Sequence, residues 1–237
     1  MKFAIVGTRG IPARYGGFET FAEELSTRLA QRGHTLTVYC RARYEHPAYR
    51  GVRLVYLPTI AHKYFDTIAH TLFSTLHVVF RSRYDAVLYC NAANAIFTWM
   101  PRLVGMPVAL NVDGLERNRK KWNSLAKTWY QMSEKLATWM PNEIVTDAQA
   151  IEDYYRERYQ RSSTMIPYGA ELGPVATDDV LSKLGLARGN YFLYVSRMGA
   201  GEQRSAGARS VRTRCGRRQA GADRRRSLRG GLHRPSA

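Results

Sequence analysis

The chain has 237 residues, 45% of them hydrophobic, which is enough for one large domain or two small ones and excludes disorder over the whole length. The net charge of +17 suggests an anionic partner, but residues 199–237 hold eleven arginines against two carboxylates and so carry +9 of it. No apolar run is long enough for a membrane span or a signal peptide, which predicts a cytoplasmic protein.

The first thirty residues have the pattern of a strand, a glycine-rich loop and a helix. Residues 3–6 are apolar and are closed by Gly7, as in a parallel strand that is buried on both faces. A helical pattern begins at Glu19, and the apolar residues Phe21, Leu25 and Leu29 recur at helical spacing. Thr20 is expected to cap this helix, with Glu23 completing a capping box.

The loop between strand and helix has the composition of an anion site. Gly10, Gly16 and Gly17 let the backbone approach an anion closely, and Arg9 and Arg14 add positive charge beside a helix N-terminus. A phosphate or diphosphate is the expected ligand. The alternative is that the glycine pair only forms a tight turn into the helix. The spacing fits neither the dinucleotide fingerprint G-x-G-x-x-G nor a nucleoside-triphosphate loop, which argues against an NAD-dependent enzyme.

Apolar strands and amphipathic helices then alternate along the chain. The predicted strands span residues 35–40, 52–57, 86–90, 108–112 and 143–146. The predicted helices span residues 64–81, with one broad apolar face, 92–103, stopped near Pro101, and 147–159. This alternation predicts an α/β fold, a Rossmann-like parallel sheet with right-handed crossovers and flanking helices.

One acidic residue follows a predicted strand at the edge where ligands bind in such sheets. Asp113 comes directly after the strand at 108–112, so it should share an edge with the glycine loop. A structural role as the N-cap of the next helix explains it equally well.

Histidines and cysteines do not form a recognisable metal site. No cluster of carboxylates or cysteines accompanies the histidines in or near the helix at 64–81, which are His62, His70 and His77. The cysteines lack metal or redox spacing and are expected as thiols in a reducing compartment; they are Cys40, Cys90 and Cys215. The sequence therefore predicts no bound metal.

A helix with tryptophans at spacings of three and four follows residue 121. Trp122, Trp129 and Trp139 lie among other apolar residues, interleaved with lysines and arginines. Such a helix can lie on an anionic membrane surface, or its apolar stripe can face the core. Both interpretations stay open on the sequence alone.

Four stretches carry a resemblance to a known family. Residues 6–12 read Val-Gly-Thr-Arg-Gly-Ile-Pro, and residues 15–20 read Tyr-Gly-Gly-Phe-Glu-Thr. Together with residues 111–122 and the Ile-Pro-Tyr-Gly segment at 166–169, they resemble bacterial family 4 glycosyltransferases of the rhamnosyltransferase-like branch, which have the GT-B fold. The chain then looks like the N-terminal half of such an enzyme.

The resemblance implies a retaining transferase with a nucleotide sugar as substrate and no resident cofactor. The acceptor would be lipid-linked or a polysaccharide of the cell envelope, which implies a location at the inner face of the membrane. Asp113 and Glu116 are the implied catalytic candidates, Arg119 a sugar-binding residue, and Arg197 a contact to the donor diphosphate. The predicted phosphate-binding residues of the loop complete the site: Gly10, Arg14, Gly16 and Gly17.

Three segments are expected. Residues 1–170 form the acceptor-side domain, and residues 171–198 form a linker and the first strand, at 191–195, of a nucleotide-sugar domain. Residues 199–237 contain no lysine and no aromatic residue, so they bury too little apolar surface to offset their ordering entropy and are expected to be disordered.

The same tail looks like the product of a shifted reading frame. Residues 199–204 can be written GGA GCC GGA GAA CAA CGC, which one base later encodes Glu-Pro-Glu-Asn-Asn, the continuation expected after Ser-Arg-Met in this branch. Residues 219–226 shift in the same direction to a plausible next strand. We therefore expect the donor domain to be lost and this chain alone to transfer little or no sugar.

Two other classes of function remain open. A nucleic-acid-binding protein would explain the basic balance, but the tail has no interleaved aromatic residues, so no specific nucleic-acid binding is expected. A non-catalytic membrane-surface module would use Trp122 and Trp129 of the basic helix.

Overall fold

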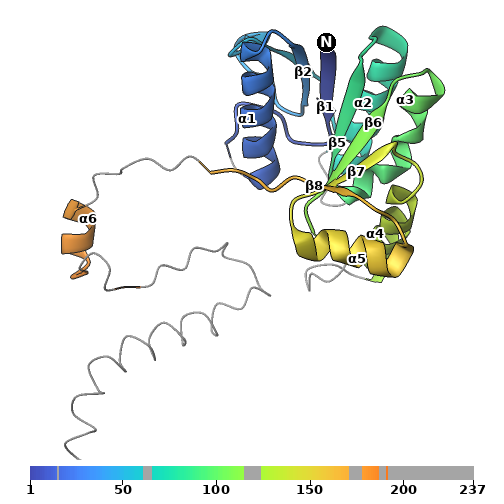
Figure 1. The fold of residues 1–237 in the computed structure, drawn as a ribbon. Helices are drawn as coiled ribbons and strands as arrows, with labels where there is room; N and C mark the ends of the chain where they lie inside the picture. The colour runs from blue at the N-terminus through green and yellow to red at the C-terminus, as the bar shows by residue number, and fades with distance from the viewer. Residues whose placement is uncertain (15, 61–65, 115–123, 171–177, 187–190, 192–237) are drawn as a thin grey trace, which may run out of the picture. The chain divides into compact units, whose positions relative to one another are not determined.

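The computed structural model describes residues 1–14, 16–60, 66–114, 124–170, 178–186 and 191 (Figure 1). The chain divides into two compact units, Met1–Ala170 and Glu171–Ala237. In the second unit, the described residues include the short helix α6 (Asp178–Lys183). The first unit contains all the other described elements.

One eight-stranded sheet forms the centre of the first unit, with strand order β3-β4-β2-β1-β5-β6-β7-β8. All neighbouring strands are parallel except β3 and β4. The chain leaves β1 toward β2 and later crosses to β5 on the other side of β1, so the topology switches there, which is where such sheets bind ligands. The strands are β1 (Lys2–Val6), β2 (Thr35–Cys40), β3 (Ala48–Tyr49), β4 (Val52–Tyr56), β5 (Ala86–Cys90), β6 (Val108–Val112), β7 (Glu143–Thr146) and β8 (Thr164–Met165).

Helices cover the two faces of the sheet unequally (Figure 1). Because the connections from β1 to β2 and from β4 to β5 run in opposite directions along the sheet, right-handed crossovers place α1 and α2 on opposite faces. The connections from β5 to β6, β6 to β7 and β7 to β8 run in the same direction as that from β4 to β5, so their helices lie on the same face of the sheet as α2. The helices are α1 (Gly17–Gln31), α2 (Asp66–Arg81), the 3-10 helix η1 (Ala92–Phe97), α3 (Trp99–Leu103), α4 (Ser124–Ala137) and α5 (Gln149–Tyr159).

Alternating residues of β1 supply two hydrophobic clusters. Ile5 packs in one cluster with Ala22 of α1, whereas Ala4 and Val6 pack in the other with Val78 of α2. All five side chains are fully or almost fully buried. Because both faces of the sheet are covered here, the strand is a continuous apolar run rather than an alternating one.

The helix α2 was predicted from an apolar face, but the structure buries the opposite, more polar face of this helix. Tyrosines of the strands reach its polar side: the Thr75 hydroxyl lies 2.8 Å from the Tyr89 hydroxyl, and His77 Nδ1 lies 3.0 Å from the Tyr39 hydroxyl. Thr75 also donates to the carbonyl four residues earlier, so its hydroxyl is satisfied without water. Phe80 is left in solvent. The buried residues of α2 are His70, Thr71, Ser74, Thr75 and Val78.

The predicted capping box at the start of α1 is wrong. The N-cap is Gly16, and Thr20 lies inside the helix, where its hydroxyl donates to the Gly16 carbonyl at 3.1 Å. Glu23 binds the backbone N–H of Ala13 instead of that of Thr20. The helix therefore begins three residues before the predicted cap. The sequence did not reveal this start because its N-cap is a glycine, which has no side chain to mark the position.

The remaining predicted elements agree with the described structure except in the following details. The region predicted as one helix over 92–103 consists of η1 and α3, and Pro101 lies within the first turn of α3, where a proline is tolerated. The two-residue strands β3 and β8 were not predicted, because two residues show no periodicity. Residues 64–65 of the predicted helix, residues 192–195 of the predicted strand and the tail at 199–237 lie outside the described residues.

Candidate functional site

The glycine loop lies at the carboxyl end of β1 and packs against the end of β2. Gly10 is buried with a φ of +106°, and a Cβ built on it would lie 2.5 Å from the Sγ of Cys40. The backbone N–H of Arg41 donates to the Arg9 carbonyl at 3.0 Å. Glycine is therefore required at position 10 both by its backbone conformation and by its closeness to β2.

The first turn of α1 faces the end of this loop. Gly16, with a φ of +112°, is the N-cap, and the first N–H with an acceptor inside the helix is that of Thr20, which donates to the Gly16 carbonyl at 3.2 Å. The N–H groups of Gly17 and Phe18 belong to the first turn, which has no intrahelical acceptor. A Cβ on Gly17 would meet nothing within 4 Å, so the approach to this turn is open.

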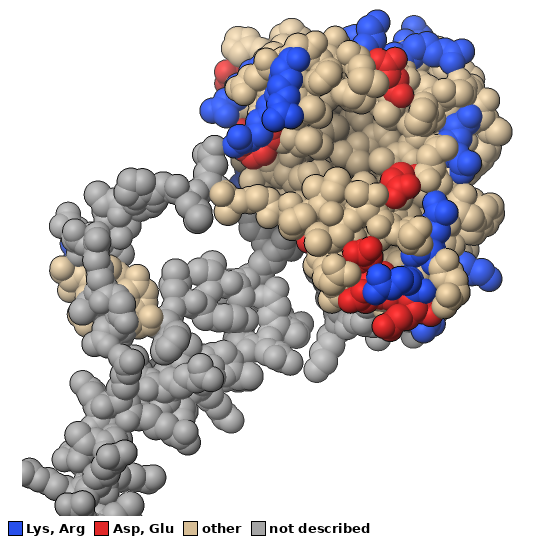
Figure 2. Space-filling model, viewed as in Figure 1, with Lys and Arg blue, Asp and Glu red and all other residues tan. Residues whose placement is uncertain are grey.

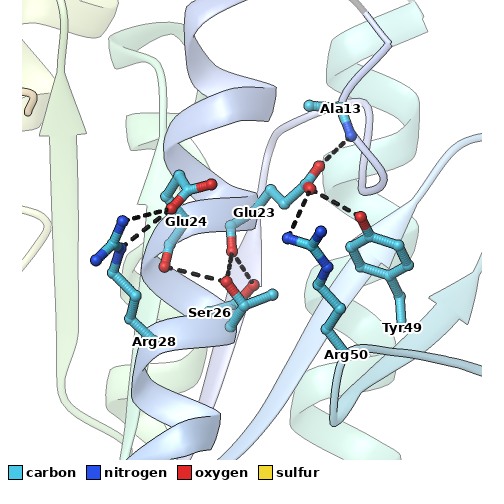
Figure 3. Close-up of polar contacts among 8 residues, drawn as sticks. Ala13, Glu23, Glu24, Ser26, Arg28, Tyr49 and Arg50 are labelled. Atoms are coloured by element: carbon cyan, nitrogen blue, oxygen red, sulfur yellow. Dashed lines mark hydrogen bonds and ion pairs between the residues drawn. The ribbon is translucent and has the colours of Figure 1, made fainter. Parts of the chain in front are cut away.

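Two glutamates of α1 accept hydrogen bonds from the loop. Glu19 Oε1 accepts from the Arg9 N–H at 3.1 Å. Glu23 Oε2 accepts from the Ala13 N–H at 2.5 Å, and its Oε1 accepts from the Tyr49 hydroxyl at 2.9 Å (Figure 3). These two loop N–H groups are satisfied within the protein. An anion at this loop would therefore be bound by the first turn of α1 and by arginine side chains.

A cavity of about 210 Å³ opens beside the loop and is lined by Arg9, Arg14, Arg43, Glu19 and Tyr44, among others. The three arginines are exposed, and Figure 2 shows basic side chains gathered over the region of α1. The excess of guanidinium groups over the one carboxylate favours an anionic ligand. The cavity is smaller than the roughly 300–1,000 Å³ of complete small-molecule sites, so its size suits a phosphate or diphosphate subsite.

A half-buried ion pair lies at the end of β2, directly before the residues of the next loop that line the cavity. Arg41 Nη1 lies 2.6 Å from Asp66 Oδ2 at the start of α2, and Arg41 Nη2 donates to the Thr67 hydroxyl. Burial lowers the pKa of the Arg41 guanidinium, and the Asp66 carboxylate opposes this effect. Arg41 directly follows β2. Its side chain pairs with α2, and its backbone N–H donates to the Arg9 carbonyl of the glycine loop.

The other side of the same sheet edge is acidic. Asp113 follows β6, and Asp147 follows β7. Burial raises the pKa of the Asp147 carboxyl. The hydroxyl of Tyr168 donates to Asn111 Oδ1 at 3.0 Å. Burial is the main cause that raises the pKa of the Tyr168 hydroxyl. Cys90 and the carboxylates of Asp113 and Asp147 raise it further.

The basic and acidic sides share one edge of the sheet because of the strand order. β5 lies between β1 and β6, and it pairs with both in parallel, so the loops after β1 and β6 leave the same edge. Cys90 ends β5 as a free, fully buried cysteine. Burial raises the pKa of its thiol, and the carboxylates of Asp113 and Glu19 raise it further.

The described structure brings five of the predicted site residues to this edge. They are Gly10, Arg14, Gly16, Gly17 and Asp113. Glu116, Arg119 and Arg197 lie outside the described residues. Within the described ranges, no group of three or more His, Cys, Asp and Glu is placed to hold a metal ion.

Several residues of this edge were not predicted. Glu19 looks like an ordinary first-turn residue of a helix, and Glu23 was expected only as a capping-box residue. Arg43 belongs to a polar loop after β2. Tyr168 was quoted only as part of a family segment. The signal that could have found Arg43 is its position just after a strand that neighbours β1.

Comparison with solved structures gives the class of this domain. Sucrose-phosphate synthase from Thermosynechococcus elongatus aligns with a TM-score of 0.61 at 19% identity, over 78% of this chain and 53% of that one. WaaG, a glycosyltransferase involved in lipopolysaccharide biosynthesis, aligns with a TM-score of 0.56 at 15% identity, over 79% and 52%. Anabaena HepE, in complex with UDP and glucose, aligns with a TM-score of 0.53 at 11% identity, over 78% and 50%.

The fold is therefore the Rossmann-like α/β domain of GT-B glycosyltransferases, and the chain spans about half the length of these structures. By sequence, residues 1–171 match the family described as a domain of unknown function, DUF1972, and the chain belongs to that family. No curated protein matches the sequence. Among the helices that the structure describes, none is both long and apolar enough to cross a bilayer.

Proposed function

We propose that the chain is the acceptor-side half of a retaining GT-B glycosyltransferase of the rhamnosyltransferase-like branch. It would act on a nucleoside-diphosphate sugar, without a resident cofactor, and on a lipid-linked or polysaccharide acceptor of the cell envelope. The observation that carries this proposal is the arginine-lined cavity between the glycine loop and the end of β2. The cavity lies at the carboxyl end of the sheet, beside the loop that follows β1, and β1 borders the switch point between β1 and β5. This neighbourhood supports a role toward the donor's phosphates.

In such a reaction, the bond between the sugar carbon and the diphosphate oxygen breaks, the acceptor hydroxyl oxygen forms the new glycosidic bond, and the hydroxyl proton passes to the departing diphosphate. Negative charge grows on the departing diphosphate. The first-turn N–H groups of α1, at Gly17 and Phe18, and the Arg14 side chain would stabilise that charge. The proposed role of Asp113 is at the acceptor hydroxyl, since it lies at the other end of the same edge.

The remaining roles rest on the family resemblance alone. Glu116 is proposed as a second catalytic carboxylate, Arg119 as a sugar contact, and Arg197 as the donor-side cation. We further propose that residues 199–237 are translated in a shifted frame, so that this chain alone transfers little or no sugar. The chain would work in the cytoplasm, at the inner face of the membrane that carries its acceptor.

Calorimetric titration of the purified chain with UDP and with inorganic diphosphate tests the phosphate site. Arg14→Ala and Arg9→Ala should each weaken diphosphate binding by roughly three- to tenfold, because a charge-assisted contact is lost. Arg28→Ala is the matched control, since this α1 arginine pairs with Glu24 away from the cavity. Equal affinity in all four proteins would refute the site.

A radiolabelled transfer assay tests the reaction. The chain is compared with the product of a gene in which the codons after Met198 are restored to the alternative frame, using several nucleotide sugars and lipid-linked acceptors. We expect transfer only with the restored product. Robust turnover by the present chain would contradict the proposed dependence on the second domain, and no turnover by either would contradict the enzyme assignment.

A non-catalytic membrane-surface protein is the second candidate, and one observation favours it. Large apolar side chains of α2, α3 and the end of α4 are exposed in the described structure. Diphosphate binding that is unaffected by Arg14→Ala, together with tight binding to vesicles, would favour this candidate over the transferase.

A further inference from the structure

Four large apolar side chains stand in solvent at the amino-terminal edge of the sheet, opposite the glycine loop. Phe80 at the end of α2 and Leu103 at the end of α3 are each 76% exposed. Trp99 at the start of α3 is 42% exposed, and Trp139, just after α4, is 61% exposed. We call these four residues the apolar edge. Leaving so much apolar area in water is unfavourable unless it is covered in the working state.

Hydrogen bonds from two arginines join the three chain segments that carry the apolar edge. The Arg83 guanidinium, in the loop after α2, donates to the carbonyl of Val104 at the end of α3 at 2.5 Å. The Arg102 guanidinium of α3 donates to the carbonyl of Trp139 at 3.1 Å and to that of Met140. The ends of α2, α3 and α4 are therefore held side by side, and the apolar edge is one surface.

A groove runs along the same surface. It has a volume of about 490 Å³, and its lining includes Trp99, Leu103, Met106 and Pro107, with Arg102 beside them. The lining is mostly apolar, so the groove suits hydrocarbon better than a polar ligand. An acyl chain is the simplest occupant of this shape and chemistry.

Positive charge surrounds the apolar edge. Arg81, Arg83 and Arg102 lie on or beside it, whereas α2 has no carboxylate after Asp66 and α3 has none at all. Two carboxylates also lie near these segments and keep their negative charge: Asp85, which accepts from the backbone N–H of Lys2, and Glu143, which accepts from the hydroxyl of Thr164. The three arginines exceed them. A second copy of the chain would oppose arginines to arginines, so the charge favours an anionic partner over self-association.

We propose that the apolar edge seats this protein on an anionic lipid bilayer. Phe80, Leu103 and Trp99 insert at the level of the headgroups and upper acyl chains, while the arginines contact lipid phosphates. The proposal rests on the membrane-side location given above and names the surface responsible, but it does not require sugar transfer.

This surface differs from the tryptophan stripe expected from the sequence. Leu136 of that stripe packs against the core, and Trp129 is half-buried. Trp122 and the side chain of Leu125 lie outside what the structure describes. Only the end of α4, through Trp139, joins the apolar edge. The membrane contact is therefore built mainly by α2 and α3, for neither of which the sequence predicted a place on a membrane.

Sedimentation with vesicles tests the proposal on the full chain. Wild-type protein should bind phosphatidylcholine vesicles that contain phosphatidylglycerol and bind pure phosphatidylcholine weakly. The double variant F80S/L103S should lose at least about tenfold in partitioning, since two inserted side chains are removed. Arg81→Glu should lose severalfold and become less sensitive to salt. Ile60→Ser, which changes a residue 56% exposed beyond the opposite end of the sheet, is the matched control and should bind as wild type.

The arginine-rich residues 199–237 could bind anionic vesicles by charge alone, so the measurement is repeated at high salt. Screening removes that contribution, whereas insertion of apolar side chains persists. Wild type should then retain a bound fraction that F80S/L103S lacks. Identical binding of the two proteins at both salt concentrations would overturn the proposal.

Three further readouts separate the alternatives. Urea unfolding should give the same midpoint for F80S/L103S and wild type, because both side chains are exposed. If wild type does not bind vesicles but forms a concentration-dependent dimer that F80S/L103S lacks, the surface serves self-association instead. If wild type does not bind vesicles but binds an oligonucleotide that F80S/L103S does not bind, the surface serves nucleic acid. Arg14→Ala should keep vesicle binding and F80S/L103S should keep diphosphate binding, so failure of one proposal is distinguishable from failure of the other.

Discussion

The hydroxyl of Tyr168 donates a 3.0 Å hydrogen bond to the Oδ1 of Asn111, which lies 57 positions earlier in the chain. Asn111 is in β6, and Tyr168 follows β8. The Tyr168 ring also stacks on Phe21 of α1, with ring centroids 4.9 Å apart. The segment after β8 thus crosses the carboxyl edge of the sheet toward α1 (Figure 1).

Removing that hydroxyl should destabilise the first unit. Tyr168→Phe leaves the buried Asn111 oxygen without its donor, which should lower the free energy of unfolding by about 1–2 kcal/mol. Urea titration followed by tryptophan fluorescence measures the change. Tyr56 is the control: its ring is about as exposed as that of Tyr168, at 40% against 36%, but within the described structure its hydroxyl makes no comparable hydrogen bond. Tyr56→Phe should change stability by less than about 0.5 kcal/mol. Equal effects in the two variants would show that the Tyr168 hydrogen bond does not stabilise the edge.

Glu23 should be more important to stability than its neighbour Glu24. Its carboxylate accepts from Ala13 and from Tyr49, so Glu23→Gln replaces one acceptor by an amide donor (Figure 3). We expect a loss of about 1–3 kcal/mol in the free energy of unfolding. Glu24→Gln, which removes only an exposed ion pair with Arg28, should cost about 0.5 kcal/mol or less. A larger loss for Glu24→Gln than for Glu23→Gln would contradict the account of the loop.

Stability should fall in mild acid because of His70. The ring is completely buried, and burial, together with the Arg41 guanidinium, lowers the pKa of His70 to about 4, against a weaker opposing effect of Asp66. The unfolded chain, with a histidine pKa of about 6.5, binds a proton that the folded chain excludes, so this contribution to stability is complete above about pH 6.5 and is lost toward pH 4, by roughly 2–4 kcal/mol in total.

A substitution isolates this effect. His70→Leu should remove that part of the decrease, measured as the difference in unfolding free energy between about pH 7 and pH 4.5. His46→Leu changes an exposed histidine and should leave the decrease as in wild type. If His70→Leu shows the same acid sensitivity as wild type, other groups cause it.

Gly10 should tolerate substitution less well than a glycine with a similar backbone in open space. Gly10→Ala places a Cβ 2.5 Å from Cys40 Sγ at a φ of +106°, so overpacking adds to backbone strain, and we expect a loss of about 2–4 kcal/mol. Gly105→Ala, at a φ of +78° with no atom within 4 Å, should cost only about 1 kcal/mol. Thermal unfolding of both variants measures the difference, and equal losses would show that the contact with Cys40 relaxes freely.

Local pattern was sufficient for the strands and for the class of fold. The runs that became β1, β2, β5, β6 and β7 were predicted within one residue, because a strand covered on both faces is mostly apolar over consecutive positions. The order of strands and helices then predicted the parallel sheet, and hence the edge shared by Gly16, Gly17 and Asp113. These are properties of neighbouring residues along the chain.

Tertiary structure alone decided which groups meet at that edge and which surfaces stay in solvent. The chain has no local feature that sends Glu23 to the Ala13 N–H, or pairs Arg41 with Asp66, because each partner is brought in by a different element. The outward face of α2 is the clearest case: its periodicity marks an apolar face, but tyrosines of β2 and β5 bond to His77 and Thr75 of the polar one, and Phe80 is left outside. Periodicity shows that a helix has two faces, and only the chemistry of its neighbours determines which face is buried.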